Sequence, residues 1–382
     1  MTKRCTRLHR DERGMSFVFV GMGFMAFLAA STLAIDVGMF MTARSQAQNS
    51  ADAGALAGAV ALAFDDFDNR SASGPAVRSA LIASRTNTVV GGEVSIEPDD
   101  VQFLMSPAGI NNRVKVTVYR TGGNSVPTLM GKYFGVQSVD ITATATAEAS
   151  PANAMTCVKP FIIPDRWVEK QNPPWDEDDT FEMFDNHNNP LPDADVYIPA
   201  GQPGYAGYNQ ESDRGRLLVI RAGGGSEIHP TFYFSLAIGG MEGTGGADYD
   251  WNIRNCNTTI MHIGDIVIQE PGNMVGPTVS GAEELIAKDP NAYWDFAKNT
   301  VVSQYHPSPR VFPIPLYDPI YYTTGKMEGR YGDFKVANWI GFFLERIESN
   351  QLYGRIIPIG GIVDSNYPMN PGAFPVAIRL VE

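Results

Sequence analysis

The sequence is short of basic residues. Among its 382 residues, 29 are lysine or arginine and 42 are aspartate or glutamate, so the formal net charge is −13. Proteins that bind nucleic acid need clustered Lys and Arg side chains, which replace the counterions of the phosphates. This composition therefore argues against nucleic acid as a partner. The content of hydrophobic residues, 44%, indicates a folded chain, long enough for two or three domains.

The sequence also lacks the motifs of common active sites and metal centres. It contains no Gly-x-Ser-x-Gly elbow, no phosphate-binding loop and no paired glutamate motif. Its five histidines are scattered, without the short spacings that metal ligands need. We therefore expect a protein that is not an enzyme and that holds no cofactor and no metal.

The acidic segment 176–195 is the strongest candidate for a cation site. Oxygen-rich loops bind calcium, and this segment is rich in aspartate. Its spacing fits no EF-hand, because His187 and Asn189 stand where acidic ligands and glycine are expected. A solvated acidic loop is the favoured interpretation, and a surface calcium site is the alternative.

Charge is absent altogether from residues 15–35. As a helix, these residues span about 31 Å, which is the thickness of a bilayer core. Five basic residues precede the segment, and Lys and Arg beside a first span stay cytoplasmic. The sequence therefore predicts a cytoplasmic tail over residues 1–14, a transmembrane helix over 15–37 and a chain that continues outside the cytoplasm. The basic residues of the tail are Lys3, Arg4, Arg7, Arg10 and Arg13.

Two other interpretations of this segment involve cleavage. A signal peptide has an apolar core of roughly 7–15 residues, shorter than this one, and the best cleavage site, after Ala34, has Thr32 three residues before the cut. A type IV pilin leader cut after Gly14 would need glutamate at the position of Phe19. A retained anchor is the favoured interpretation.

Beyond Asp36 the helical pattern continues as a stalk. No proline occurs between residues 38 and 63, and alanines recur every four residues on one helical face. Two glycines add a small-x-x-x-small pair, which lets another helix approach closely. This packing ridge meets either a partner helix or a sheet of its own domain, whereas Asp36, at the membrane exit, is expected to be solvated. The ridge consists of Ala47, Ala51, Gly54, Ala55, Gly58 and Ala59, and the alanine series ends at Ala63.

Shorter elements follow the stalk. A helix is expected from Pro75 to about Arg85, and alternation of Val114, Val116 and Val118 with polar residues predicts a half-buried strand. Further strands are expected at 94–96, 101–105 and 139–150. A helix capped by Ser125 and stopped by Gly135 is expected to carry an apolar face. Residues 38–150 would then form a small antiparallel sheet packed on the stalk. The apolar face would consist of Leu129, Met130, Tyr133 and Phe134.

The stretch "GMSFVFVGMGFMAFLAASTLAIDVGMFMTARSQAQNSADAGALAGAVAL" closely resembles the N-terminal module of TadG-like proteins of the Flp (Tad) pilus assembly system. That module pairs a span ending in A-x-D-x-G with an alanine-rich stretch around an Ala-Asp pair. The resemblance extends over about residues 12–150. It implies a single-pass structural component of the inner membrane, with most of the chain in the periplasm and the stalk helix in contact with other pilus components. The matching residues are Ala34, Asp36, Gly38, Gln48, Ala51, Asp52, Ala53, Ala55, Leu56 and Ala57.

Residues 151–382 lack the Asp-x-Ser-x-Ser run of the von Willebrand A domain that many TadG-like proteins carry. Their strand-like pieces lie at 216–222, 231–238, 265–270 and 354–363, with helices expected at 277–288 and 339–348. The expected fold is α+β overall, with a β-rich, sandwich-like domain at this end. An adhesin-like or surface-binding module without a pilus role is the alternative function.

The three cysteines predict one disulfide. Cys5 lies in the tail assigned to the cytoplasm, where thiols stay reduced. Cys157 and Cys256 are left as an even pair in the part assigned to an oxidising compartment. We expect them to be bonded. Two buried free thiols or a metal-binding pair are the alternatives.

Overall fold

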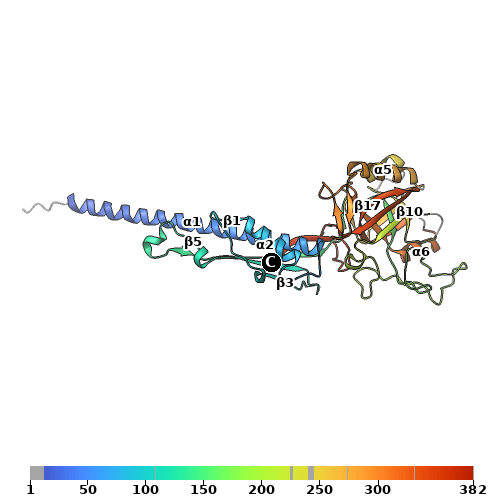
Figure 1. Cartoon of the computed structure of the whole chain (residues 1–382), viewed down its shortest axis with the longest axis horizontal. Helices are drawn as coiled ribbons and strands as arrows, with labels where there is room; N and C mark the ends of the chain where they lie inside the picture. The colour runs from blue at the N-terminus through green and yellow to red at the C-terminus, as the bar shows by residue number, and fades with distance from the viewer. Residues whose placement is uncertain are drawn as a thin grey trace, which may run out of the picture.

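The computed structural model describes residues 13–107, 109–223, 227–239, 245–272, 274–330 and 332–381. The molecule is a long rod with a rounded domain at one end, and the expected cytoplasmic tail lies almost wholly outside the described residues (Figure 1). The helix α1 (Arg13–Phe64) runs unbroken for 52 residues, and its N-terminal half projects alone from the rod. This confirms that the apolar span and the stalk form one helix.

The stalk module packs a helix and a sheet against the C-terminal half of α1. The helix α2 (Pro75–Thr86) begins at a proline, as expected. The sheet is antiparallel with the order β19-β7-β4-β3, and the residues of β4 alternate between buried and half-buried. The predicted half-buried strand and the small antiparallel sheet are therefore both present. The sheet strands are β3 (Val101–Leu104), β4 (Arg113–Arg120), β7 (Ile141–Pro151) and β19 (Val376–Val381).

Small residues of α1 form the inner face of this module. Ala51 and Ala55 are fully buried in one core with α2 and the sheet valines. A Cβ atom added to Gly54 would lie 2.0 Å from Ser84 Oγ, and one added to Gly58 would lie 2.9 Å from Val114 Cγ1. Only glycine allows this approach. The ridge therefore packs on α2 and the sheet of its own module, which is the second of the two expected alternatives, and its buried residues offer no surface to a partner helix.

The helix expected between Ser125 and Gly135 is absent. The segment forms a two-stranded ribbon, whose strands are joined by a loop with a short 3₁₀ turn. Backbone N–H groups at the start of this loop bind Asp36 instead of carbonyl groups one helical turn away. Only the stop at Gly135 is as expected, with φ of +87°. The elements are β5 (Val126–Pro127), η3 (Gly131–Phe134) and β6 (Ser138–Val139).

Short elements complete the module. The expected strand at 94–96 is reduced to a single bridge between Ser95 and Tyr119, and the strand at 101–105 is β3. The remaining pieces are β1 (Thr88–Val89), β2 (Gly92–Glu93), η1 (Pro98–Asp100) and η2 (Gly122–Asn124).

The rounded domain is built on a ring of six strands. The pairings run β10-β18-β17-β16-β9-β11 and return from β11 to β10, so the sheet closes on itself, and β13 pairs with both β11 and β17. The expected β-rich character is confirmed, but the sheet closes into a barrel instead of two facing sheets. Its strands are β9 (Phe161–Pro164), β10 (Leu217–Ala222), β11 (Phe232–Ala237), β13 (Ile266–Gln269), β16 (Val311–Tyr317), β17 (Asp333–Glu348) and β18 (Gln351–Ile357).

Alternate residues of all six ring strands fill the barrel, including Ile163, Ile220, Tyr233, Ile314, Phe342 and Ile356. Side chains of α4 and α5 join this same core, and α5 confirms the helix expected at 277–288 (Figure 1). The other described elements of the domain are α3 (Gln210–Asp213), α4 (Gly246–Arg254), α5 (Val275–Lys288), α6 (Pro319–Met327), β8 (Ala154–Met155), β12 (Met261–His262), β14 (Tyr293–Asp295) and β15 (Thr300–Val302).

The helix expected at 339–348 is wrong, because these residues belong to β17. Residues 336–344 are buried on both faces of the strand, so no alternation of apolar and polar residues marks them as extended. The strand pairs on one edge with β16 and on the other with β18, which satisfies the backbone of this apolar run. A buried strand and a buried helix of this length have the same apolar composition.

The last strand departs from the expected division at residue 151. β19 follows the barrel in sequence but pairs with β7 of the stalk sheet, from Val376 opposite Pro151 to Val381 opposite Thr146. The barrel is therefore inserted between two neighbouring strands of the stalk module.

Enlarging the buried ridge is expected to destabilise the stalk module. Ala51→Leu or Ala55→Leu adds three carbon atoms to a filled core, which commonly costs about 1–3 kcal/mol. We expect limited proteolysis of the detergent-solubilised protein to cut the stalk module faster in either variant. Val60→Leu, at an exposed position of the same helix, is the control. Wild-type protection in both alanine variants would contradict the internal packing.

Candidate functional site

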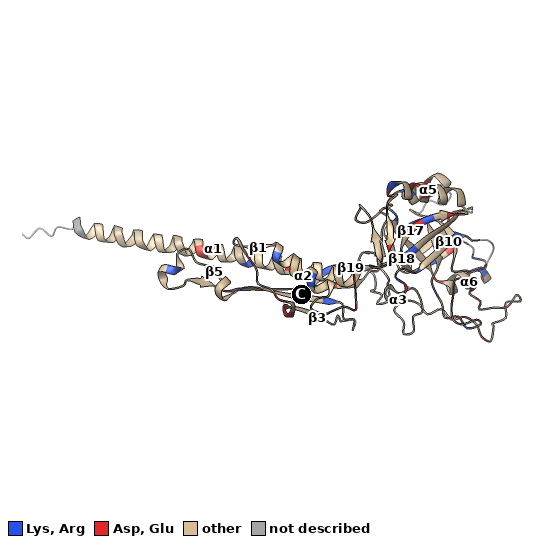
Figure 2. Ribbon diagram, viewed as in Figure 1, with Lys and Arg blue, Asp and Glu red and all other residues tan. Residues whose placement is uncertain are grey.

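The N-terminal half of α1 presents an apolar surface on all sides. Within the described residues, α1 is the one helix that is long and apolar enough to cross a membrane. Residues 15–35 contain no charged residue, and the described part of the projecting half is tan over most of its length (Figure 2). None of the described residues covers this surface, and its length and apolar composition suit a bilayer core. The exposed side chains are Met15, Phe17, Val18, Phe19, Val20, Met22, Phe24, Met25, Phe27, Leu28, Leu33, Ile35 and Val37.

Asp36 is buried, which corrects the expectation that it is solvated. Its side chain is only 4% exposed. The carboxylate accepts hydrogen bonds from the backbone N–H groups of Leu129 at 2.9 Å, Met130 at 3.1 Å and Gly131 at 2.6 Å. Hydrogen bonds to a charged acceptor are stronger than neutral ones, and three of them compensate for the loss of water. The C-terminal end of the candidate span is thus fixed to the β5–β6 ribbon.

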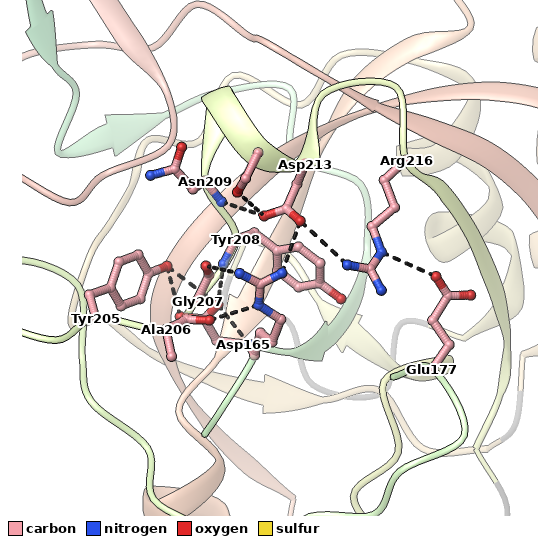
Figure 3. Close-up of polar contacts among 11 residues, drawn as sticks. Asp165, Glu177, Tyr205, Ala206, Gly207, Tyr208, Asn209, Asp213 and Arg216 are labelled. Carbon is pink, nitrogen blue, oxygen red and sulfur yellow. Dashed lines mark hydrogen bonds and ion pairs between the residues drawn. The ribbon is translucent and has the colours of Figure 1, made fainter. Parts of the chain in front are cut away.

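A polar cluster lies at one end of the barrel, where the chain leaves β9 (Figure 3). Asp165 is completely buried and accepts hydrogen bonds from Tyr197 Oη at 3.0 Å, Tyr205 Oη at 3.1 Å and the backbone N–H of Arg166 at 2.9 Å. Burial raises the pKa of Asp165 to about 6, against the effect of these donors.

Arg166, the next residue, extends the cluster. Its guanidinium pairs with buried Asp213 at 2.9 Å and donates to the carbonyl oxygen of Ala206 at 2.7 Å. Arg216 also approaches Asp213, at 3.6 Å, and reaches Glu177 at 3.3 Å (Figure 3). These bonds join β9 to loops that lie 10 to 50 residues further along the chain. The sequence analysis did not identify this cluster. The available local signal is the charged pair Asp165-Arg166 directly after the apolar residues 161–163, and it does not reveal the distant partners.

A cleft of about 510 Å³ separates the end of the stalk from the barrel. Asp65 and Phe67 line it from the end of α1, and Tyr205, Arg214 and Lys298 line it from the barrel. Arg214 Nη1 donates to the carbonyl oxygen of Asp65 at 3.2 Å, so one side chain crosses from the barrel to the stalk. The cleft therefore belongs to the junction between the two parts.

The acidic segment 176–195 uses its carboxylates to hold turns. The two oxygens of Asp195 accept from the backbone N–H groups of Lys170 at 2.9 Å and Glu182 at 2.8 Å. Asp185 accepts from the backbone N–H groups of His187 and Asn189. Among the described residues, no three His, Cys, Asp or Glu side chains are grouped so that they would hold a metal ion. The calcium alternative has no geometric support in this part of the chain.

The predicted disulfide joins Cys157 to Cys256. It links the segment that leaves the stalk sheet to the end of α4. The buried Lys159, two residues further, donates from Nζ to the carbonyl oxygens of Ile253 and of Asn255, the latter at 2.9 Å. Burial lowers the pKa of Lys159 to about 7. The disulfide and the hydrogen bonds of the Lys159 amino group thus hold the start of the barrel domain against the same helix end.

The buried Asp165 predicts a pH-dependent stability. An unfolded aspartate has a pKa of about 3.9. The folded chain therefore binds more protons than the unfolded chain between pH 4 and 6, and stability falls as the pH rises through this range. In the wild-type protein the free energy of unfolding is expected to fall by about 2–3 kcal/mol between pH 4 and 6. Asp165→Asn should not show this fall, which thermal unfolding in detergent at several pH values would measure. The exposed Asp193→Asn should keep the dependence, and an unchanged pH profile in Asp165→Asn would contradict the assignment.

Loss of the disulfide is expected to destabilise the barrel. The bond closes a loop with a sequence separation of 99 residues, and removal of such a bond typically costs about 2–5 kcal/mol. The double variant Cys157→Ser, Cys256→Ser should show a lower midpoint in thermal unfolding, while Cys5→Ser should not. Free thiols at both positions, seen by mass analysis of non-reduced protein from an oxidising compartment, would show that the bond does not form.

Comparison with known proteins gives one match. Residues 14–61 match the family model described as putative Flp pilus-assembly TadE/G-like. No curated protein and no solved structure matches the chain. The match covers the apolar half of α1, Asp36 and the buried ridge, and it ends before α2. Over residues 14–61 the chain is therefore TadE/G-like, as the sequence pattern indicated.

Proposed function

We propose that the chain is a membrane-anchored structural component of a Flp-type pilus assembly apparatus, and that it is not an enzyme. The observation that carries the proposal is the coincidence of the TadE/G-like match with α1, whose N-terminal half is apolar and exposed on all sides. The family description associates this segment with pilus assembly. The exposed surface needs a bilayer around it.

The proposed orientation has the N-terminus in the cytoplasm of the cell and the barrel in the periplasm. The basic residues before the span and their scarcity after it favour this orientation. The disulfide between Cys157 and Cys256 is consistent with an oxidising compartment for the barrel. In this arrangement α1 crosses the inner membrane once, and the stalk module holds the barrel away from the bilayer.

A structural role also fits the chemistry of the barrel. Asp165, the most buried carboxyl group of the polar cluster, has no exposed surface. Its partners are hydroxyl and amide groups of the loops that it joins. Because the ridge of α1 is used internally, other pilus components would contact surfaces of the chain other than the ridge.

The proposal predicts that pilus assembly depends on this chain. Deletion of the gene should abolish surface pili, counted by electron microscopy, and expression of the intact chain should restore them. The chain without residues 15–35 should not restore them, because it has lost its anchor. Normal piliation in the deletion strain would contradict a pilus role and favour an independent surface-binding module.

The membrane topology of the chain is tested separately from its role in piliation. A reporter that is active only in the periplasm should be active when fused after Arg70, and the intact protein should fractionate with membranes. A shortened soluble form that starts near Met15 or Ile35 would contradict a retained anchor.

A further inference from the structure

We propose that the loop of residues 129–136, called here the interfacial loop, is a second membrane-contacting element. It would rest in the interface of the outer leaflet, beside the point where α1 leaves the hydrocarbon. This inference rests on the proposed membrane anchorage of α1, and it adds to it a contact from a segment more than 90 residues further along the chain.

The interfacial loop exposes large apolar side chains in close succession. Tyr133 is 75% exposed, Phe134 72%, Leu129 51% and Val136 49%. Single exposed apolar side chains are ordinary on protein surfaces, but a contiguous group of them marks a contact site. The neighbouring sheet of the same module, in contrast, buries its apolar side chains against α1.

Asp36 fixes the depth of this loop along α1. Three consecutive backbone N–H groups, those of residues 129–131, bind its carboxylate, so the loop lies against the helix at this turn. The apolar exposed surface of α1 continues on both sides of the same turn, through Leu33 before it and Met41 after it. The β5–β6 ribbon extends along α1 beyond α2, toward the projecting N-terminal half (Figure 1). The loop is therefore level with the outer end of the span.

The composition of the loop suits the membrane interface. Residues 126–139 contain no acidic residue, and their one basic residue is Lys132. Its Nζ lies 5.3 Å from the centre of the Tyr133 ring. Aromatic residues are enriched at the level of the lipid headgroups, and lysine side chains there extend their ammonium groups toward water. This combination of side chains favours the headgroup region over the hydrocarbon centre.

Most backbone N–H groups of the loop have hydrogen-bond partners within the protein, as a region with little water requires. The N–H groups of residues 129–131 bind Asp36, and the N–H of Tyr133 donates to Met130 at 3.0 Å. The N–H of Val136 donates to the carbonyl oxygen of Gly131 at 3.0 Å. At the base of the loop, the N–H of Thr128 donates to the carbonyl oxygen of Gln137, also at 3.0 Å. Backbone groups near lipid need internal partners. A protein partner would not require this internal pairing, so lipid is the favoured occupant.

Fluorophore labelling of single cysteines in the full-length chain tests the proposal. An environment-sensitive fluorophore is attached to Phe134→Cys, Phe24→Cys or Ile82→Cys in a Cys5→Ser background, and each protein is reconstituted into phosphatidylcholine vesicles. All three native side chains are exposed, so the labels do not disturb a core. Quenchers placed near the headgroup, deep in the acyl chains or in the water report the depth of each label.

The label at residue 134 should be quenched most by the headgroup quencher, several-fold more than the label at residue 82. The label at 24 should respond to the deep quencher, and the label at 82 only to the aqueous one. If the label at 134 behaves like that at 82 while 24 is quenched by lipid, the loop proposal is overturned and the anchor stands. If 24 is not quenched by lipid either, the anchorage itself has failed. A label at 134 that is aqueous in vesicles but protected in native membranes would identify a protein partner and overturn the lipid contact.

Discussion

The hydrogen bonds between the Asp36 carboxylate and three backbone N–H groups connect α1 to the sheet module that packs on it. A charged side chain at the end of an apolar span is costly unless it is paired, and Asp36 is paired by the loop at residues 129–131. This contact fixes the register of α1 against the sheet module. It also explains why residues 125–135 do not form the expected α-helix, because an α-helix would use most of those N–H groups for its own carbonyls.

Features that depend on short-range spacing could be predicted from the sequence. The unbroken α1, the proline start of α2 and the alternation of Val114, Val116 and Val118 are local patterns, and the structure confirms them. The disulfide was also predictable, from the even number of cysteines beyond the span rather than from any geometry. The TadE/G-like resemblance is confirmed over residues 14–61, where the match lies.

Features that depend on distant partners could not be predicted. The alanine spacing showed that Ala51 and Ala55 share a face, but it did not show that α2 and the sheet fill that face. The strand β17 is buried on both sides, so its apolar run resembles a helix. Closure of the barrel and the Asp165 cluster join segments tens of residues apart. The local sequence around Asp165 does not indicate that Tyr197 and Tyr205 are its hydrogen-bond partners.

The return of β19 to the stalk sheet has a mechanical consequence. A domain that follows a single linker swivels about it, but this barrel leaves the stalk through β7 and comes back through β19, its neighbour in the sheet. The two antiparallel strands are paired from residues 146 to 151 and 376 to 381, so a sideways load on the barrel is shared between two connections that lie side by side. Both strands leave the sheet at the same end, so the part of a pull on the barrel that β19 carries passes into β7 through the hydrogen bonds between them. Two connections that lie side by side restrict rotation of the barrel about either one, so the barrel and the stalk sheet are expected to turn together.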